Sequence, residues 1–225
     1  MANSFSKLTL SKLFLIQWLN IAVLTIMAII RTHLSILASS FREIILLLLI
    51  CSPLSASESK VDTLPITSFK PDSPNLGWYV QNDNVMGGRS EGGFNIALEQ
   101  LIFSGNTNTK GGGLSSIRTE PLILDLSGYT GIRVRVKADG RRYTWQLQTD
   151  ARWRGRQVNY WADFDTTVEE VSVIDIPFTK FFPQFRGFRL DGPDLDASQI
   201  TQLGLYIYDK KDGPFELRLM SVEAY

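Results

Sequence analysis

The most regular pattern of the chain lies in residues 131–138, where apolar and polar side chains alternate without a break. Because successive side chains of a β-strand point to opposite faces of a sheet, this alternation predicts a strand with one buried and one polar face. The buried face holds Ile132, Val134 and Val136, and the polar face holds Arg133, Arg135 and Lys137. The pattern recurs at 142–149, and there we expect Tyr143 and Trp145 to contribute to a core.

Short segments of this kind follow one another from Val61 onward, separated by Gly, Pro, Asn and Asp, and no long stretch has helical periodicity. This arrangement is typical of an all-β sandwich or barrel. The predicted strands are Gly77–Gln81, Gly93–Ala97, Gln100–Ser104, Leu114–Arg118, Gly131–Ala138, Arg142–Thr149, Val158–Phe164, Val171–Pro177, Leu203–Tyr208 and Phe215–Glu223.

Two of the connections have the residues of tight turns. Asp139-Gly140 separates the two strands described first, and glycine accepts positive φ without steric cost, so we expect these strands to pair as a hairpin. Asp209-Lys-Lys-Asp-Gly-Pro214 predicts a second hairpin between the last two strands. For Thr179–Phe185, which follows a proline that ends a strand, we expect one helical turn or an irregular bridge.

The first 57 residues are much more apolar than the rest. Residues 13–30 form an uncharged run of 18 residues, the lower limit for a membrane-spanning helix. A second run, Ile44–Cys51, follows Arg42 and precedes small residues, as in a secretory signal. A mitochondrial presequence and a buried helical hairpin are the other interpretations. We expect residues 1–57 to be a hydrophobic leader, signal or anchor, that carries a β-sandwich domain of residues 58–225 to or across a membrane.

The amino-acid composition excludes several kinds of functional site. The chain has 23 basic and 23 acidic residues, and residues 1–57 contain four of the basic and one of the acidic ones, which leaves 19 and 22 for the domain. A nucleic-acid binder would carry a basic surplus. The single histidine, His33, and the single cysteine, Cys51, both lie in the apolar segment. The domain therefore lacks the usual zinc and copper ligands and the side chains of histidine- or cysteine-dependent catalysis. We expect no cofactor, no metal and no catalytic residue.

Six phrases occur in the order found in a known family. They are Asn82-Asp-Asn-Val-Met-Gly-Gly-Arg-Ser90, then Phe103-Ser-Gly105 with Gly111-Gly-Gly113 and Ser116-Ile-Arg118, then Asp125-Leu-Ser-Gly-Tyr-Thr-Gly-Ile132, Val136-Lys-Ala-Asp-Gly-Arg141, Ile176-Pro-Phe178 and Ile207-Tyr-Asp-Lys-Lys-Asp-Gly-Pro-Phe215. Through them the domain resembles the complex I intermediate-associated protein 30 family, whose domain is similar to galactose-binding-like jelly rolls. The resemblance implies a jelly-roll β-sandwich with a chaperone-like role in assembling a membrane complex. At Trp161 the sequence departs from the family pattern, where a glutamine is usual.

The glycine-rich phrase at 82–90 has two interpretations. In one it shapes an irregular connection, in which the glycines supply positive φ and close backbone approach and Met86 is buried. In the other it is the polar rim of a recognition surface, where Arg89 and Arg118 offer bidentate donors to a carboxylate of a partner. A phosphate-binding loop is disfavoured because no Lys-Ser/Thr follows the glycines. The candidate binding residues are Asn82, Asp83, Met86, Gly87, Gly88, Arg89, Ser90, Arg118 and Trp153.

Aromatic residues leave a carbohydrate-binding function open. Trp153 lies among three arginines in the polar segment 150–156, so we expect an exposed ring that contacts a partner or an anionic surface. The acidic turns at 191–196 and 209–212 lack a recognisable calcium-ligand spacing. Asp163 and Asp165 permit glycoside hydrolysis without being diagnostic of it.

These observations lead to one functional hypothesis and one alternative. We expect a non-catalytic module that binds protein subunits of a membrane complex or assembly intermediate, in a membrane-associated, exported or mitochondrial location. The alternative is a lectin-like jelly roll that binds carbohydrate. Nucleic acid is not an expected partner.

Overall fold

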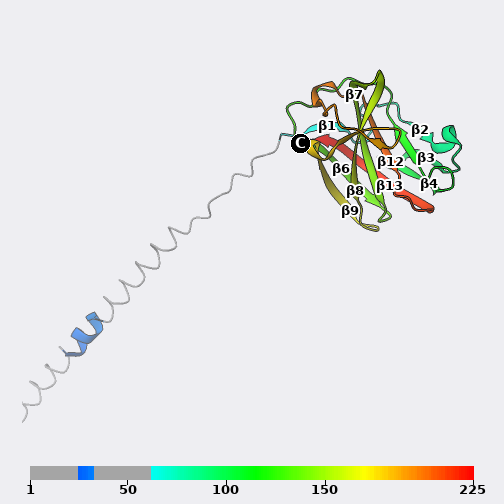
Figure 1. Ribbon diagram of the computed structural model, residues 1–225. Coiled ribbons are helices and arrows are strands. Elements are labelled where there is room, and N and C mark those ends of the chain that lie inside the picture. Colours follow the sequence, from blue (N-terminus) through cyan, green and yellow to red (C-terminus); the bar gives the residue numbers. More distant parts are fainter. Residues whose placement is uncertain (1–24, 33–61) are drawn as a thin grey trace, which may run out of the picture. The chain divides into compact units, whose positions relative to one another are not determined.

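The computed structural model describes residues 25–32 and 62–225 (Figure 1). The chain divides into two units, Met1–Ser59 and Lys60–Tyr225. Within the first unit, residues 25–32 are helical and exposed. No helix among the described residues has the length and apolar character needed to cross a bilayer. Most of the expected leader therefore lies outside the described residues, and its function stays a prediction.

The second unit consists of two antiparallel β-sheets. The first sheet has the order β3 (Glu91–Ala97), β4 (Gln100–Thr107), β13 (Gly213–Ala224), β6 (Gly131–Ala138) and β9 (Val171–Pro177), and β1 (Leu64–Thr67) also pairs with β13. The second sheet has the order β11 (Phe188–Arg189), β10 (Phe182–Phe185), β8 (Arg156–Asp165), β7 (Arg142–Trp153), β12 (Gln202–Ile207), β5 (Ser115–Arg118) and β2 (Tyr79–Asn82). The short 3₁₀ segments are η1 (Asp83–Met86), η2 (Phe178–Lys180) and η3 (Ala197–Gln199). The expected all-β fold is confirmed.

One hydrophobic core is built by the facing sides of both sheets. The apolar face of β6 is buried as predicted, and Tyr143 and Trp145 of β7 are fully buried in the same core. Burial of apolar surface on this scale is the main favourable term in folding. The opposite face of the second sheet carries polar and aromatic side chains, and the candidate site lies on that face.

The two hairpins predicted around Asp139-Gly140 and around residues 209–214 do not form, because in each case the two strands belong to different sheets. Strand β6 pairs with β13 and β9, whereas β7 pairs with β8 and β12. The turn at Asp139-Gly140 therefore carries the chain from the first sheet to the second, although Gly140 has the expected positive φ of 82°. The turn at 208–212 returns the chain from β12 to β13, in the other sheet. A tight turn has the same residue preferences whether it joins strands within a sheet or between sheets, so the turn sequence did not reveal the partner.

A buried ion pair holds these two crossings together. Arg141 Nη2 lies 2.6 Å from Asp209 Oδ1, and both side chains are almost fully buried. The same guanidinium donates to the carbonyl oxygens of Lys211, Gly213 and Pro214. Two of the phrases that carry the family resemblance, 136–141 and 207–215, thus meet at one cluster and position the ends of both sheets.

Three strands were missed by the sequence analysis. The segment 179–185, expected to be a helical turn or bridge, begins within η2 but continues as β10, which pairs with β8 through Gln184 and Asn159. Its apolar residues and the central proline hide the alternation that identifies a strand. Strands β1 and β11 are only four and two residues long, too short for a periodic pattern.

Candidate functional site

Asp83 organises the glycine-rich phrase at 82–90, which links β2 to β3. Its carboxylate is fully buried and accepts hydrogen bonds from four groups. The donors are the backbone N–H groups of Ser90 (2.9 Å), Gly113 (2.7 Å) and Leu114 (3.0 Å) and the Ser90 hydroxyl (2.8 Å). The carboxylate thus joins two glycine-rich stretches that are distant in sequence. A buried charge is tolerated only when it is hydrogen-bonded in this way. The Asp83 carboxylate therefore has a structural role, which is to hold the two loops together.

The neighbouring glycines are required by the closeness of the backbone to this carboxylate. A Cβ atom added at Gly88 or at Gly112 would overlap the Asp83 carboxyl group. Gly87 instead has a φ of 87°, in the left-handed region at the end of η1, where glycine pays no steric penalty. The repeated glycines of both phrases therefore have a structural cause.

Hydrogen bonding controls the ionisation of Asp83. Burial by itself raises the pKa of the carboxyl group, but the hydrogen bonds from Leu114, Ser90 and Gly113 outweigh it and hold the pKa below its ordinary value. The group is therefore an anion at neutral pH, and its charge is neutralised by dipoles of the surrounding loops.

The remaining residues of the phrase lie in different environments. Ser90 is buried against Asp83, and the Asn82 side chain bonds to the Gly92 carbonyl oxygen and the Ser115 hydroxyl. Met86, the last residue of η1, is 64% exposed, so the interpretation in which it is buried is wrong. Arg89 is also exposed. The polar rim imagined for this phrase is thus largely turned inward.

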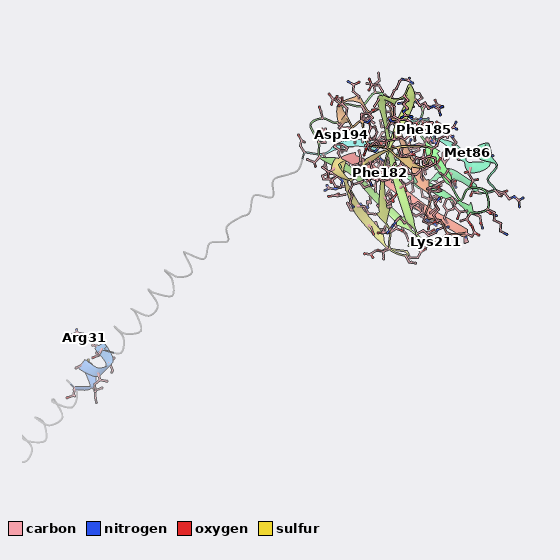
Figure 2. The ribbon with its side chains drawn as sticks, in the orientation of Figure 1. Arg31, Met86, Phe182, Phe185, Asp194 and Lys211 are labelled. Carbon is pink, nitrogen blue, oxygen red and sulfur yellow. The ribbon has the colours of Figure 1, made fainter. Side chains whose placement is uncertain are left out.

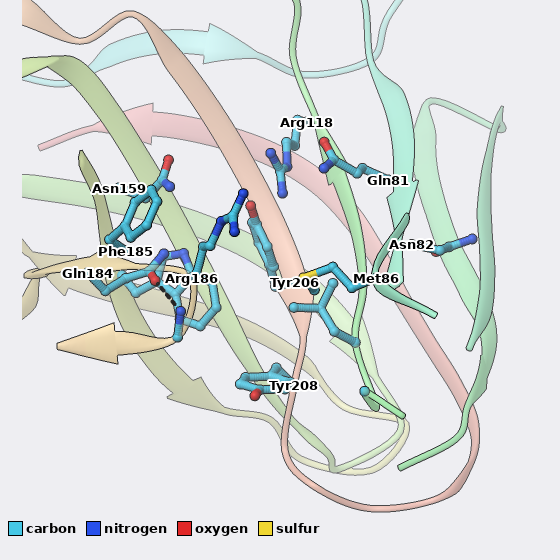
Figure 3. Close-up of a pocket in the computed structure, with 14 residues that line it drawn as sticks. Gln81, Asn82, Met86, Arg118, Asn159, Gln184, Phe185, Arg186, Tyr206 and Tyr208 are labelled. Carbon is cyan, nitrogen blue, oxygen red and sulfur yellow. Dashed lines mark hydrogen bonds between the residues drawn. The ribbon is translucent and has the colours of Figure 1, made fainter. Parts of the chain in front are cut away.

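A cleft of about 560 Å³ lies on the outer face of the second sheet, within the usual size range of ligand pockets. Five strands supply its walls: Gln81 and Asn82 come from β2, Arg118 from β5, Asn159 and Trp161 from β8, Gln184 and Phe185 from β10, and Tyr206 from β12. Figure 3 shows these side chains with Met86, Arg186 and Tyr208, which lie in the flanking turns. Figure 2 places Met86 and Phe185 among the side chains of the whole domain.

The floor of the cleft is a fixed, neutral network. The buried Gln146 side chain accepts hydrogen bonds at Oε1 from Trp161 Nε1 (3.1 Å) and from the Tyr206 hydroxyl (2.6 Å). The rings of Trp161 and Tyr206 lie 5.0 Å apart between centroids. Burial raises the pKa of Tyr206, so its hydroxyl stays protonated. A floor held in this way presents one shape to a ligand.

Arginines give the cleft a positive charge. The Arg118 guanidinium carbon lies 5.2 Å from the centre of the Tyr206 ring, and its Nε is buried without a hydrogen-bond partner among the described residues. In Figure 3 the guanidinium groups of Arg118 and Arg186 both point into the cleft. No Asp or Glu is among the lining residues. An unpaired buried donor beside a second cation favours an anionic ligand.

Some of the sequence-predicted residues meet in this cleft and others do not. Arg118, Asn82 and Met86 line it. Gly87, Gly88, Arg89 and Ser90 belong to the adjacent connection and do not line it. Trp153 lies at the end of β7 rather than in a loop, is half-buried against the core, and contacts Phe185 at a centroid distance of 6.5 Å.

The sequence analysis did not identify Trp161 and Tyr206 as residues of the cleft floor. Trp161 and Tyr206 occupy polar-face positions of β8 and β12, which alternate with core residues, and that alternation was the available signal. The departure from the family pattern at Trp161 was a second signal. The contributions of Gln184 and Arg186 had no signal, because strand β10 was not predicted.

The carboxylates considered for glycoside hydrolysis or calcium binding form hydrogen bonds or ion pairs within the domain. Asp163 accepts a hydrogen bond from the Thr144 hydroxyl, and Asp165 pairs with Arg142. Asp196 caps η3 by accepting from the Ser198 N–H. Among residues 25–32 and 62–225, no three His, Cys, Asp or Glu side chains are grouped so as to hold a metal ion.

Two solved carbohydrate-binding modules have a similar fold. The family 11 module of the Clostridium thermocellum cellulase Lic26A-Cel5E superimposes with a TM-score of 0.54 and 16% identity over 74% of this chain and 95% of that one. A family 30 carbohydrate-binding module gives a TM-score of 0.50 and 17% identity over 73% and 98% of the two chains. At such identities the likeness shows the fold alone.

A sequence relative and a family model match this chain. An uncharacterised protein of Schizosaccharomyces pombe is 28% identical over 173 residues, which cover 65% of this chain and 79% of that protein. The model of the complex I intermediate-associated protein 30 family matches residues 67–219, a span that includes nearly every strand and all the cleft residues. The chain therefore belongs to the complex I intermediate-associated protein 30 family.

Proposed function

We propose that this domain is a non-catalytic module that binds a protein subunit of a membrane complex during assembly, and that its N-terminal leader delivers it to the membrane. The observation that carries the proposal is the cleft on the second sheet. It combines a Trp, two Tyr and two Arg side chains in one recess, and these three residue types dominate the energetic centres of protein interfaces. The family name supports complex I, or a related membrane complex, as the assembly concerned.

The state of the aromatic rings favours a protein ligand over a sugar. Sugars stack on exposed ring faces, but Trp161 is 8% exposed and Tyr206 is 1% exposed. The Tyr208 ring has the Lys210 ammonium 3.3 Å from its centre. The polar atoms of Trp161 and Tyr206 already donate to Gln146, so these two rings offer almost no open face on which a sugar could stack.

Carbohydrate binding is the second candidate, and the fold favours it. The family 11 and family 30 modules described above are named for carbohydrate binding, and the cleft here lies on an open sheet face lined by amide side chains. A sugar would use the Gln81, Asn159 and Gln184 amides together with the exposed part of Tyr208.

Affinity purification tests the first candidate. The tagged full chain is isolated from solubilised membranes of its source, beside the variants Arg118→Gln in the cleft and Arg135→Gln on the outer face of the first sheet. We expect subunits of one membrane complex with the wild type and with Arg135→Gln, and their loss with Arg118→Gln. Recovery of the same proteins by all three chains would contradict a binding role of the cleft.

A glycan array separates the second candidate from the first. The wild type and Tyr208→Ala are applied to the same array, and thermal unfolding confirms that the variant is folded. A reproducible sugar signal that disappears in Tyr208→Ala, together with no recovered subunits, would replace the protein-binding proposal by the carbohydrate one.

A further inference from the structure

The cleft opens beside an unusual concentration of arginines. Strands β7 and β8 are joined by a turn at Arg154-Gly155, and β10 and β11 by a turn at Arg186-Gly187. Because β8 pairs with β10, the two hairpins are neighbours in the second sheet. The arginines of these hairpins are Arg152, Arg154, Arg156, Arg186 and Arg189. The surplus is local, since residues 58–225 hold more acidic than basic residues.

Aromatic rings, not carboxylates, contact four of these five guanidinium groups. Arg156 and Arg186 lie over the Phe185 ring, with 5.2 and 5.5 Å between the guanidinium carbons and the ring centre. Arg154 lies 4.5 Å from the centre of the Trp153 ring, and Arg189 lies 4.6 Å from that of Phe182. None of the ion pairs within residues 62–225 involves an arginine of these hairpins or Arg118. Their charges are uncompensated within the described part of the domain.

The neutral groups of the cleft add donors to these charges. Gln184 Oε1 accepts from the Gly187 N–H, and Asn159 Oδ1 accepts from Gln148 Nε2. Within residues 62–225 neither Gln184 Nε2 nor Asn159 Nδ2 has a hydrogen-bond acceptor, so both can donate to a ligand. Arginine has only donors, so this part of the cleft offers many donors and few acceptors. Its complement is a ligand rich in oxygen acceptors and negative charge.

We propose that the cleft and the adjoining arginine hairpins bind an acidic, extended peptide segment, with one Asp or Glu carboxylate held by Arg118 in the cleft and further carboxylates facing Arg154, Arg156 and Arg186. This inference rests on the proposed protein-binding function and names the chemistry of the partner. The Arg118 Nε is recessed, which excludes a flat anionic membrane surface as its ligand. Peptide carbonyl oxygens suit the free amide donors between the charged positions, and a carboxylate fits the planar guanidinium.

A charge-matched pair of peptides tests the inference. A fluorescent ten-residue peptide of alternating Glu and Gly is titrated into the full chain, and the same peptide with Gln in place of Glu serves as the control. We expect the Glu peptide to bind at least about tenfold more tightly, because charge-assisted bonds to arginine are lost in the control. Binding should weaken as the salt concentration rises above about 0.1 M, because the Debye length is already only about 10 Å at that concentration and becomes shorter.

Variants locate the binding site. Arg118→Gln and Arg186→Gln should each weaken binding of the Glu peptide by about tenfold, while Arg135→Gln, an exposed arginine of the first sheet, should leave it unchanged. Equal binding of the Glu and Gln peptides would overturn the inference, and so would equal affinities of all three variants. Thermal unfolding confirms that each variant is folded.

Competing polyanions complete the test. Oligogalacturonate, single-stranded RNA and vesicles containing anionic lipid are titrated under the same conditions. If any of these polyanions binds more tightly than the Glu peptide, the proposed acidic peptide is wrong and that class of ligand takes its place. If affinity purification recovers subunits through the cleft but the Glu peptide shows no preference, the inference fails and the protein-binding function stands. If no subunit is recovered and only a glycan binds, the protein-binding function itself fails.

Discussion

At the scale of single residues, the phrase 82–90 is explained by one buried carboxylate. Its glycines, which at first suggest a ligand-binding loop, are needed because backbone passes directly beside Asp83. The sequence gives the residues of the phrase, but it does not indicate that Gly112 and Gly113 contact Asp83 in the folded domain. Residue roles inside this loop were therefore not predictable without the contact between distant segments.

Replacing Asp83 tests this role. In Asp83→Asn an amide NH₂ would face N–H donors, and we expect the free energy of unfolding to fall by about 3 kcal/mol, because buried bonds to a charged acceptor are lost. Urea unfolding measures the change. Asp72→Asn, at an exposed position, should change stability by less than about 0.5 kcal/mol. Equal stability of both variants would contradict the structural role.

Acid should destabilise the domain through the same group. The pKa values of Asp83 and Asp209 are held below the ordinary 3.8. A carboxyl group with a lowered folded-state pKa stabilises the fold above its unfolded-state pKa, and this contribution is lost as pH falls through the folded-state pKa. We expect stability to drop below about pH 4. The drop, followed by urea unfolding at several pH values, should be smaller in Asp83→Asn. An identical pH profile for both proteins would show that Asp83 is not responsible.

The adjacent glycines give a steric version of this test. Gly88→Ala places a methyl group on the Asp83 carboxyl, and we expect a loss of about 2 kcal/mol, as for overpacking in a core. Gly93→Ala is the matched control, since nothing lies within 4 Å of its added Cβ. Thermal unfolding compares the two, and an equal loss at both positions would mean that contact with Asp83 is not the cause.

At the scale of elements, alternation predicted the strands but not their partners. Residues 131–138 form β6 with the expected buried face, yet β6 and β7 belong to different sheets. Pairing depends on how two layers stack, and no local pattern contains that information. The same limit applies to the cleft, because its walls come from five strands that are far apart in the sequence. Asn82, Met86 and Arg118 were predicted as binding residues and do line the cleft, and among the others the polar-face positions of Trp161 and Tyr206 were readable in advance.

The cluster at the sheet crossings makes a prediction at this scale. Removing one partner of the buried Arg141–Asp209 pair leaves an uncompensated charge and unpaired carbonyl groups, so Arg141→Gln should cost about 3 kcal/mol. Arg142→Gln breaks the neighbouring pair with Asp165, where both side chains are exposed, and should cost less than about 1 kcal/mol. Urea unfolding distinguishes them. Similar losses would show that burial of the Arg141 pair does not matter.

At the scale of the whole molecule, the domain combines a rigid sandwich with an open cleft on the second sheet. The first sheet and the core fix the second sheet, and the buried Gln146 network fixes the cleft floor. Arginines at the cleft and the nearby hairpins supply the charge. A preformed recess of this kind lowers the entropic cost of binding. The proposed recognition therefore belongs to the cleft, whereas the glycine-rich turns serve folding.

Site-specific photo-crosslinking in intact membranes tests this assignment most directly. A photoreactive residue is placed in the full chain at Met86, which is exposed and lines the cleft, or at Val173, which is 61% exposed on the first sheet. We predict that position 86 yields a specific crosslink to a protein subunit of a membrane complex and that position 173 does not. Crosslinks to that subunit from position 173 alone, with none from position 86, would contradict the account.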